Sequence, residues 1–154
     1  IKKLDSEYII YLDLIESEAL EKGDIFVTGA YLDDEGILRH SMVINRRRNF
    51  ENIEMQMRSR YNKGVMAGRN FEDYIAHEMA HIMPFQNCIT AEEYMELNAK
   101  IKSQFIKRIS KYADKKRDGR ESLAEAFVRY RNGEVIPNEA RKLIEKYILP
   151  WRRI

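Results

Sequence analysis

The chain has 154 residues, of which 44% are hydrophobic and 34% are charged. This length and composition predict one globular domain over residues 1–154 with a single core. The domain can stand alone or belong to a longer chain. The 27 lysines and arginines nearly balance the 25 acids, so a nucleic-acid-binding protein is not expected, and the arginine and lysine runs are interpreted as solvated faces or loops. No apolar run reaches the ~18 residues of a membrane span, no segment resembles a signal peptide, and we expect no membrane partner. Both a cytoplasmic protein and a delivered toxin remain open.

The first half of the chain contains signals for helices and for one hairpin. Helical spacing of apolar residues predicts a helix over residues 5–22, ended by Gly23. Two β-rich runs, 25–32 and 37–44, are joined by Asp-Asp-Glu-Gly and predict an antiparallel hairpin. Helical spacing resumes over 49–63. The short stretch 64–68 is compatible with a loop or a short edge strand.

The second half predicts helices with identifiable caps. They lie over residues 71–83 (capped by Asn70 and ended by Pro84), 90–112 (with a Thr90/Glu93 capping box), 121–133, and 138–149 (capped by Asn138). The charged run 113–120 is interpreted as a loop. The fold class expected from these elements is α+β, mostly helical, with a small antiparallel sheet.

The stretch His77-Glu78-Met79-Ala80-His81 has the form HExxH. Residues four apart project from one face of a helix, so both imidazoles can reach one ion, most plausibly zinc. Glu78 then lies beside the metal, where a base must sit to deprotonate a water bound there. The alternative is that both histidines are half-buried, hydrogen-bonded side chains and Glu78 is a surface carboxylate.

A catalytic zinc site needs a third protein ligand. His40 lies in a predicted strand, and Cys88 lies seven residues past His81, beyond Pro84, so we interpret His40 as a core or edge-strand residue and Cys88 as a small buried residue. Glu121 and Glu125 are better candidates, because they are four apart on an otherwise apolar helix face. One could bind zinc and the other could hold a ligating histidine, or both could be exposed and paired with neighbouring arginines.

The segments "YIAHEMAHIM" and "ISKYADKKRDGRESLAEAFVRY" together resemble the catalytic domain of anthrax lethal factor and related zincins, including those of phage minor head proteins and polymorphic toxins. The shared elements are HExxH, a tyrosine in "SKYA" and a helix of the form E-x-x-A-E-A-F. The resemblance covers roughly residues 40–130.

The resemblance implies a role for each matching residue. His77, His81 and Glu121 would be zinc ligands, Glu78 the general base and Glu125 the carboxylate that orients a ligating histidine. Tyr112 would donate a hydrogen bond to the oxyanion of the tetrahedral intermediate. Two features depart from the family pattern. The loop between Tyr112 and Glu121 is a couple of residues longer than in lethal factor, and the chain runs from His81 straight into Pro84 where many relatives continue the helix.

Taken together, the residues and the resemblance predict a zinc-dependent endopeptidase with a protein or peptide substrate. The substrate would pair with the strand 38–44 or with residues 64–68. Lethal factor's own substrate is not implied, because its accessory domains have no counterpart here. The alternative function is a noncatalytic zincin-like module in phage assembly or partner-protein binding.

Overall fold

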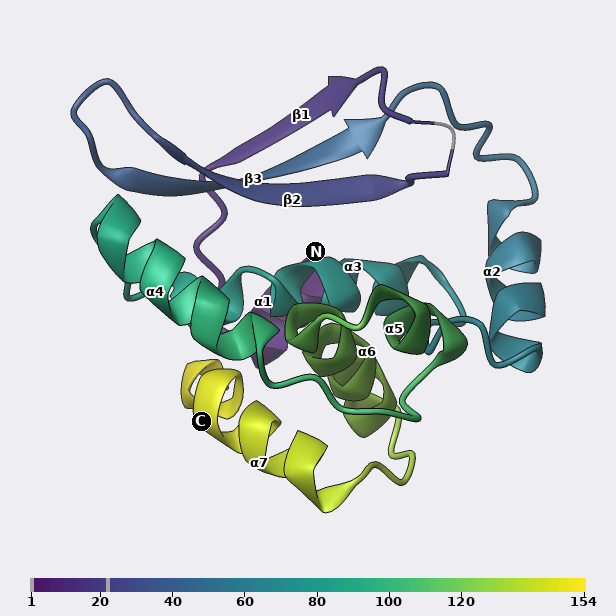
Figure 1. The fold of residues 1–154 in the computed structure, drawn as a ribbon. Coiled ribbons are helices and arrows are strands. Elements are labelled where there is room, and N and C mark those ends of the chain that lie inside the picture. Colours follow the sequence, from purple (N-terminus) through teal and green to yellow (C-terminus); the bar gives the residue numbers. More distant parts are fainter. Residues whose placement is uncertain (1, 22) are drawn as a thin grey trace.

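A computed structural model describes residues 2–21 and 23–154 (Figure 1). Within them the chain is an α+β protein of seven α-helices and one three-stranded sheet, which confirms the predicted fold class at this coarse level. The first five elements are α1 (Lys2–Glu7), β1 (Leu14–Glu18), β2 (Phe26–Leu32), β3 (Leu38–Asn45) and α2 (Ile53–Asn62). The helices that follow are α3 (Phe71–Ala80), α4 (Ala91–Lys102), α5 (Lys111–Lys116), α6 (Gly119–Arg131) and α7 (Asn138–Tyr147), with short 3-10 turns at Met83–Phe85 and Leu149–Trp151.

The sheet has the order β1-β3-β2 and lies over one side of the helices (Figure 1). β2 and β3 form the predicted antiparallel hairpin, with Phe26 opposite Ile44 and Leu32 opposite Leu38. β1 adds to β3 in parallel, so the sheet is mixed rather than purely antiparallel. β3 is therefore the central strand. No described strand pairs with the outer edge of β2, which lies next to α3.

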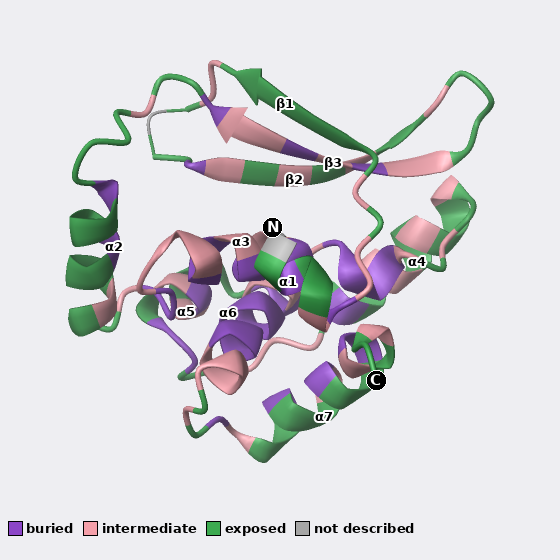
Figure 2. Ribbon diagram, turned by 180° about the vertical axis from the view of Figure 1, so that it is seen from behind, coloured by how far each residue is buried: buried purple, intermediate pink, exposed green. Residues whose placement is uncertain are grey.

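The core is centred on α6, whose inner face is fully buried (Figure 2). Phe127 is 0% exposed and forms a T-shaped ring contact with Tyr8, and α3 packs against α6 with Met79 in the same core cluster. Burying one such aromatic side chain stabilises the fold by roughly 2–3 kcal/mol. A second, smaller cluster joins α2 to α3 and to the start of β2, through Ile25, Ile53, Met57, Met66 and Tyr74.

The helix predicted over residues 5–22 is wrong beyond Glu7 within its described part, which excludes residue 22. α1 ends at Glu7, and Leu14–Glu18 form β1, although all five strand residues are exposed. Tertiary pairing overrides the local helical spacing here, because β3 offers an open edge that β1 fills. Asp13 strengthens this register: its N–H donates to the His40 carbonyl, and its carboxylate accepts from the His40 N–H.

The helix predicted over 90–112 is also wrong beyond Lys102. The capping box at its start is confirmed, since Thr90 Oγ1 accepts from Glu93 N and the Glu93 carboxylate accepts from Thr90 N. After Lys102 the chain turns, and Ile106 N donates to Ser122 Oγ of α6. The run 113–120, predicted as a loop, instead contains most of α5 and the start of α6.

Smaller differences concern helix ends and one linker. α3 ends at Ala80, before Pro84, and the last helix begins at Asn138 with Pro137 in the N-cap position and no side-chain capping hydrogen bond. Residues 64–68 form a loop and no strand. No helix in the described part of the chain is long and apolar enough to cross a membrane.

Candidate metal centre

The two motif histidines lie at the C-terminal end of α3. The helix begins as predicted, because Asn70 Oδ1 accepts a hydrogen bond from Asp73 N at 3.0 Å. His81 is the C-cap residue and keeps a helical backbone, with φ −77°. The spacing of four residues therefore still places both rings on one face, and the Nε2 atoms of His77 and His81 lie 3.2 Å apart.

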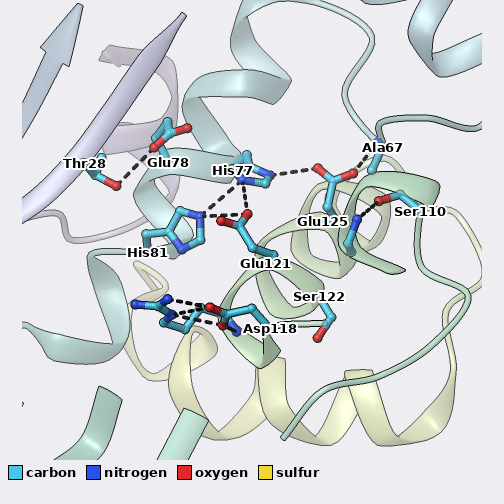
Figure 3. Close-up of polar contacts among 12 residues, drawn as sticks. Thr28, Ala67, His77, Glu78, His81, Ser110, Asp118, Glu121, Ser122 and Glu125 are labelled. Carbon is cyan, nitrogen blue, oxygen red and sulfur yellow. Dashed lines mark hydrogen bonds and ion pairs between the residues drawn. The ribbon is translucent and has the colours of Figure 1, made fainter. Parts of the chain in front are cut away.

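Glu121, in the first turn of α6, reaches the same point from the opposite side (Figure 3). Its Oε2 lies 3.2 Å from His77 Nε2 and 3.5 Å from His81 Nε2. One ligand atom from each of the three residues lies within 4.8 Å of the other two. Two imidazole nitrogens and a carboxylate oxygen converging in this way could hold a metal ion. We call these three residues, His77, His81 and Glu121, the metal cluster.

Glu125, one turn later on α6, contacts the other side of His77 (Figure 3). Its Oε1 lies 2.8 Å from His77 Nδ1, and its Oε2 accepts from the backbone N–H of Ala67 at 2.7 Å. The Glu125 side chain is fully buried. A proton on Nδ1 that is donated to Glu125 leaves the Nε2 lone pair facing His81 and Glu121, which is the tautomer that metal ligation needs.

The electrostatics of this cluster favour a cation between the carboxylates. Burial lowers the pKa of His77, but the hydrogen bonds to Glu121 and Glu125 outweigh it and hold that pKa well above its usual value. Burial raises the pKa of Glu121, yet His77 and His81 overcompensate and hold it well below its usual value. In the absence of a metal, a proton on His77 is stabilised at the position that a metal cation would occupy.

Glu78 follows His77 but points toward the sheet (Figure 3). Thr28 Oγ1 of β2 donates to Glu78 Oε2 at 3.1 Å. The carboxylate thus faces the space between β2 and the metal cluster rather than joining the three ligand candidates. This is a suitable place for a base that acts on a group held beside the metal.

Tyr112 lies at the site although the helix predicted to end with it stops at Lys102. It is the second residue of α5, and its ring centroid lies 6.2 Å from that of His77. Burial raises the pKa of Tyr112, and the nearby carboxylates of Glu121 and Glu78 raise it further. The phenol therefore keeps its proton and can act as a hydrogen-bond donor.

A cleft of about 300 Å³ opens between the sheet and the helices around these residues. Most of the residues that line the cleft were not predicted from the sequence. They come from elements far apart in the chain, such as β2 and α3 or α4 and α6, whose contacts leave no local sequence pattern. The missed wall residues include Phe26, Thr28 and Gly29 of β2, Asn98 of α4, Lys116 of α5 and Arg120 of α6.

His40 and Cys88 lie outside the metal cluster, in agreement with their interpretation as structural residues. His40 belongs to the central strand and is 5% exposed, and burial lowers its pKa. It lines the floor of the cleft. Cys88 is half-buried and packs against the main core.

Comparisons of the chain with models of protein families, with curated proteins and with solved structures found no significant match.

Proposed function

We propose that this protein is a zinc-dependent endopeptidase of the zincin type. The observation that supports it most strongly is the convergence of His77, His81 and Glu121 at one point, with Glu78 beside them on the wall of a cleft. Two histidines of an HExxH helix, a glutamate from a second helix and the HExxH glutamate beside them are together the parts that metal-assisted peptide hydrolysis requires.

The composition of the cluster favours a catalytic zinc site. Imidazole and carboxylate ligands suit zinc, and catalytic sites use three protein ligands with one position left open, whereas structural sites are closed by four. Among the described residues the cluster contains three candidates, and all three line the cleft. This favours the peptidase over a noncatalytic module with a structural zinc.

Each protein group then has a distinct task. Zinc, when bound, would supply Lewis-acid activation of a water and of the scissile carbonyl. Glu78 takes the proton of the attacking water and returns it to the leaving amine. Tyr112 donates its O–H to the developing oxyanion, and Glu125 holds His77 in the ligating tautomer.

β2 is the element best placed to bind an extended peptide. The predicted pairing to 38–44 is wrong, because β3 has a strand on both sides, and 64–68 is a loop. Asn45 N donates to the Ile25 carbonyl and Asp33 N to the Ile37 carbonyl. By the alternation of an antiparallel ladder, the even-numbered residues Phe26, Thr28 and Ala30 direct their backbone N–H and C=O groups to the free edge.

Hydrolysis of a proteome-derived peptide library by the zinc-loaded protein and by its Glu78→Gln variant tests the proposal. We expect cleavage by the native chain and a loss of about 10²-fold to 10⁴-fold in the variant, with zinc content unchanged. A library left intact by the native protein would refute the proposal. Undiminished cleavage by the variant would show that Glu78 is not the base.

A further inference from the structure

The charges of this chain are unevenly distributed, although its net charge is only +2. Residues 46–69 and 107–117 contain 13 basic and three acidic side chains, a formal charge of +10. The rest of the chain, with 14 basic and 22 acidic side chains, has a formal charge of −8. We call the two basic segments together the basic end.

The two segments are neighbours in space. Lys111 N donates to the Gly64 carbonyl at 3.0 Å and Tyr112 N to the Val65 carbonyl at 2.9 Å. α2 and α5 accordingly lie at the same end of the molecule (Figure 1). The acidic segment 16–24 adjoins this end through the bond from Arg46 N to the Glu18 carbonyl. Its formal charge of −3, with Asp73 that pairs with Arg69, still leaves +6.

Much of this positive charge is exposed to solvent. Arg69 forms an ion pair with Asp73, but Arg58, Lys115 and Lys116 have no carboxylate within ion-pair distance among the described residues. Lys116 Nζ lies over the ring of Tyr112, 5.6 Å from its centroid. An unneutralised surface of this kind attracts polyanions and speeds their association.

The basic end is continuous with the cleft of the proposed active site. Lys116 lines the cleft itself. Arg60 lines an adjoining recess together with His77, Glu78 and Tyr112. An anionic ligand on α2 and α5 would therefore extend directly toward β2 and the metal cluster.

We infer that the basic end binds an acidic segment of the polypeptide substrate and guides it into the cleft. This inference rests on the proposed peptidase function and names its substrate class. The basic end adjoins the cleft and the free edge of β2, and a strand edge pairs with the backbone of an extended peptide. A polypeptide can therefore occupy both the basic end and the cleft, whereas a nucleic acid offers no backbone that the strand edge could pair with.

Binding to the zinc-loaded Glu78→Gln protein tests the inference without hydrolysis. The probes are fluorescein-labelled peptides of equal length that alternate serine with glutamate, glutamine or lysine, measured by fluorescence anisotropy. We expect the glutamate peptide to bind most tightly and its affinity to fall steeply as salt is raised, because screening weakens exposed charge pairs. Equal binding of the glutamate and glutamine peptides would overturn the inference.

A matched pair of double variants locates the binding surface. In the Glu78→Gln background, Arg60→Gln with Lys116→Gln should weaken binding of the glutamate peptide by about tenfold. Lys100→Gln with Lys142→Gln removes the same charge from α4 and α7 and should change binding by less than about twofold. Equal losses in the two double variants would overturn the inference, as would an oligonucleotide that displaces the peptide at a lower concentration than unlabelled peptide does.

The sites cut in the peptide library separate this inference from the peptidase itself. Enrichment of aspartate and glutamate around the cut sites supports both. Cleavage without such enrichment overturns the acidic substrate and leaves the peptidase standing. A library that is not cut overturns the peptidase, and with it the assignment of the basic end as a substrate site.

Discussion

His77 has a different partner on each of its ring nitrogens. Nδ1 lies 2.8 Å from Glu125, and Nε2 lies 3.2 Å from both Glu121 and His81. The two glutamates come from adjacent turns of one helix, yet their surroundings differ. Glu121 borders the cleft, whereas Glu125 is fully buried and also accepts from the backbone of Ala67. The structure therefore predicts different effects for the same substitution at the two positions.

We expect Glu121→Gln to lower zinc affinity by more than about 100-fold, because it removes a ligand charge, and Glu125→Gln by only about tenfold. Competition with a chromophoric chelator measures both constants on matched variants. The opposite order would mean that the roles of the two glutamates are exchanged.

Tyr112→Phe removes a single hydroxyl from the cleft. If that hydroxyl stabilises the oxyanion, turnover should fall by about 100-fold while zinc content stays the same. Steady-state kinetics on a peptide found in the library, with metal analysis of the same sample, gives both numbers. Unaltered turnover would reduce Tyr112 to a packing residue.

Zinc affinity should rise with pH. The pKa of His77 is held above its ordinary value of 6.5, so a proton must leave before the metal binds. Below that raised pKa, each pH unit should increase the affinity up to about tenfold for one displaced proton. Chelator competition at a series of pH values measures the slope. A flat profile would show that His77 is not a ligand.

The same shifts affect the metal-free fold in a defined way. The raised pKa of His77 stabilises the metal-free fold fully below pH 6.5, and this stabilisation is lost as pH rises through the folded-state pKa. The lowered pKa of Glu121 contributes above 4.5, and that contribution is lost as pH falls toward its folded-state pKa. The two shifts together therefore stabilise the metal-free protein most between pH 4.5 and pH 6.5.

At the scale of elements, the position of Glu121 depends on how the start of α6 meets the end of α4. Gly119 allows this contact, because a Cβ there would lie 2.0 Å from the Ile101 carbonyl oxygen. Asp118 caps the helix and its carboxylate accepts from the Arg120 guanidinium, which also donates to Asn98 of α4. α6 thus enters the site at a fixed depth relative to α4.

Gly119→Ala should force these two helices apart. We expect destabilisation by about 3 kcal/mol, which lowers the melting temperature by about 10 °C, and weaker zinc binding because Glu121 moves. Gly23→Ala is the control, since a Cβ there meets no atom within 4 Å in the described part of the chain. Equal melting temperatures for the two variants would contradict the close contact at Gly119.

Local signals predicted those elements whose ends are fixed by caps or turns. The β2–β3 hairpin and the Asn70 and Thr90 caps could be read from the sequence, because turn and cap residues act on their immediate neighbours. β1 could not, since its pairing with β3 depends on a partner more than 20 residues away. α5 was hidden in a charged run, and its cap, Ser110 Oγ accepting from Ala113 N, lay inside a longer helical pattern.

The candidate site divides in the same way. The HExxH spacing and the pair of glutamates on α6 pointed to the site, and the resemblance chose Glu121, which the structure brings together with His77 and His81. Thr28, on the strand beside Glu78, is 50 residues away in sequence and gave no signal. The net charge of +2 also hid the basic end, because opposite charges elsewhere in the chain cancel it.

At the scale of the whole molecule, the sheet lies over one side of the helices (Figure 1), and residues of both line the cleft. β2 presents a free edge, α3 and α6 present the ligand candidates, and the basic end adjoins the cleft at Lys116. The basic end, the cleft and the free edge of β2 thus adjoin Glu78, the proposed base, and the three ligand candidates. Zinc binding at that cluster is the claim on which every other function depends.

Metal analysis of the natively purified protein tests this claim most directly. We expect about one zinc per chain, removed by a chelator and absent from His77→Ala, while Lys142→Gln retains it. The same samples, followed by circular dichroism, show whether His77→Ala remains folded. A native protein that contains no zinc and does not take it up when it is supplied, or a folded His77→Ala variant that keeps its zinc, would contradict the account.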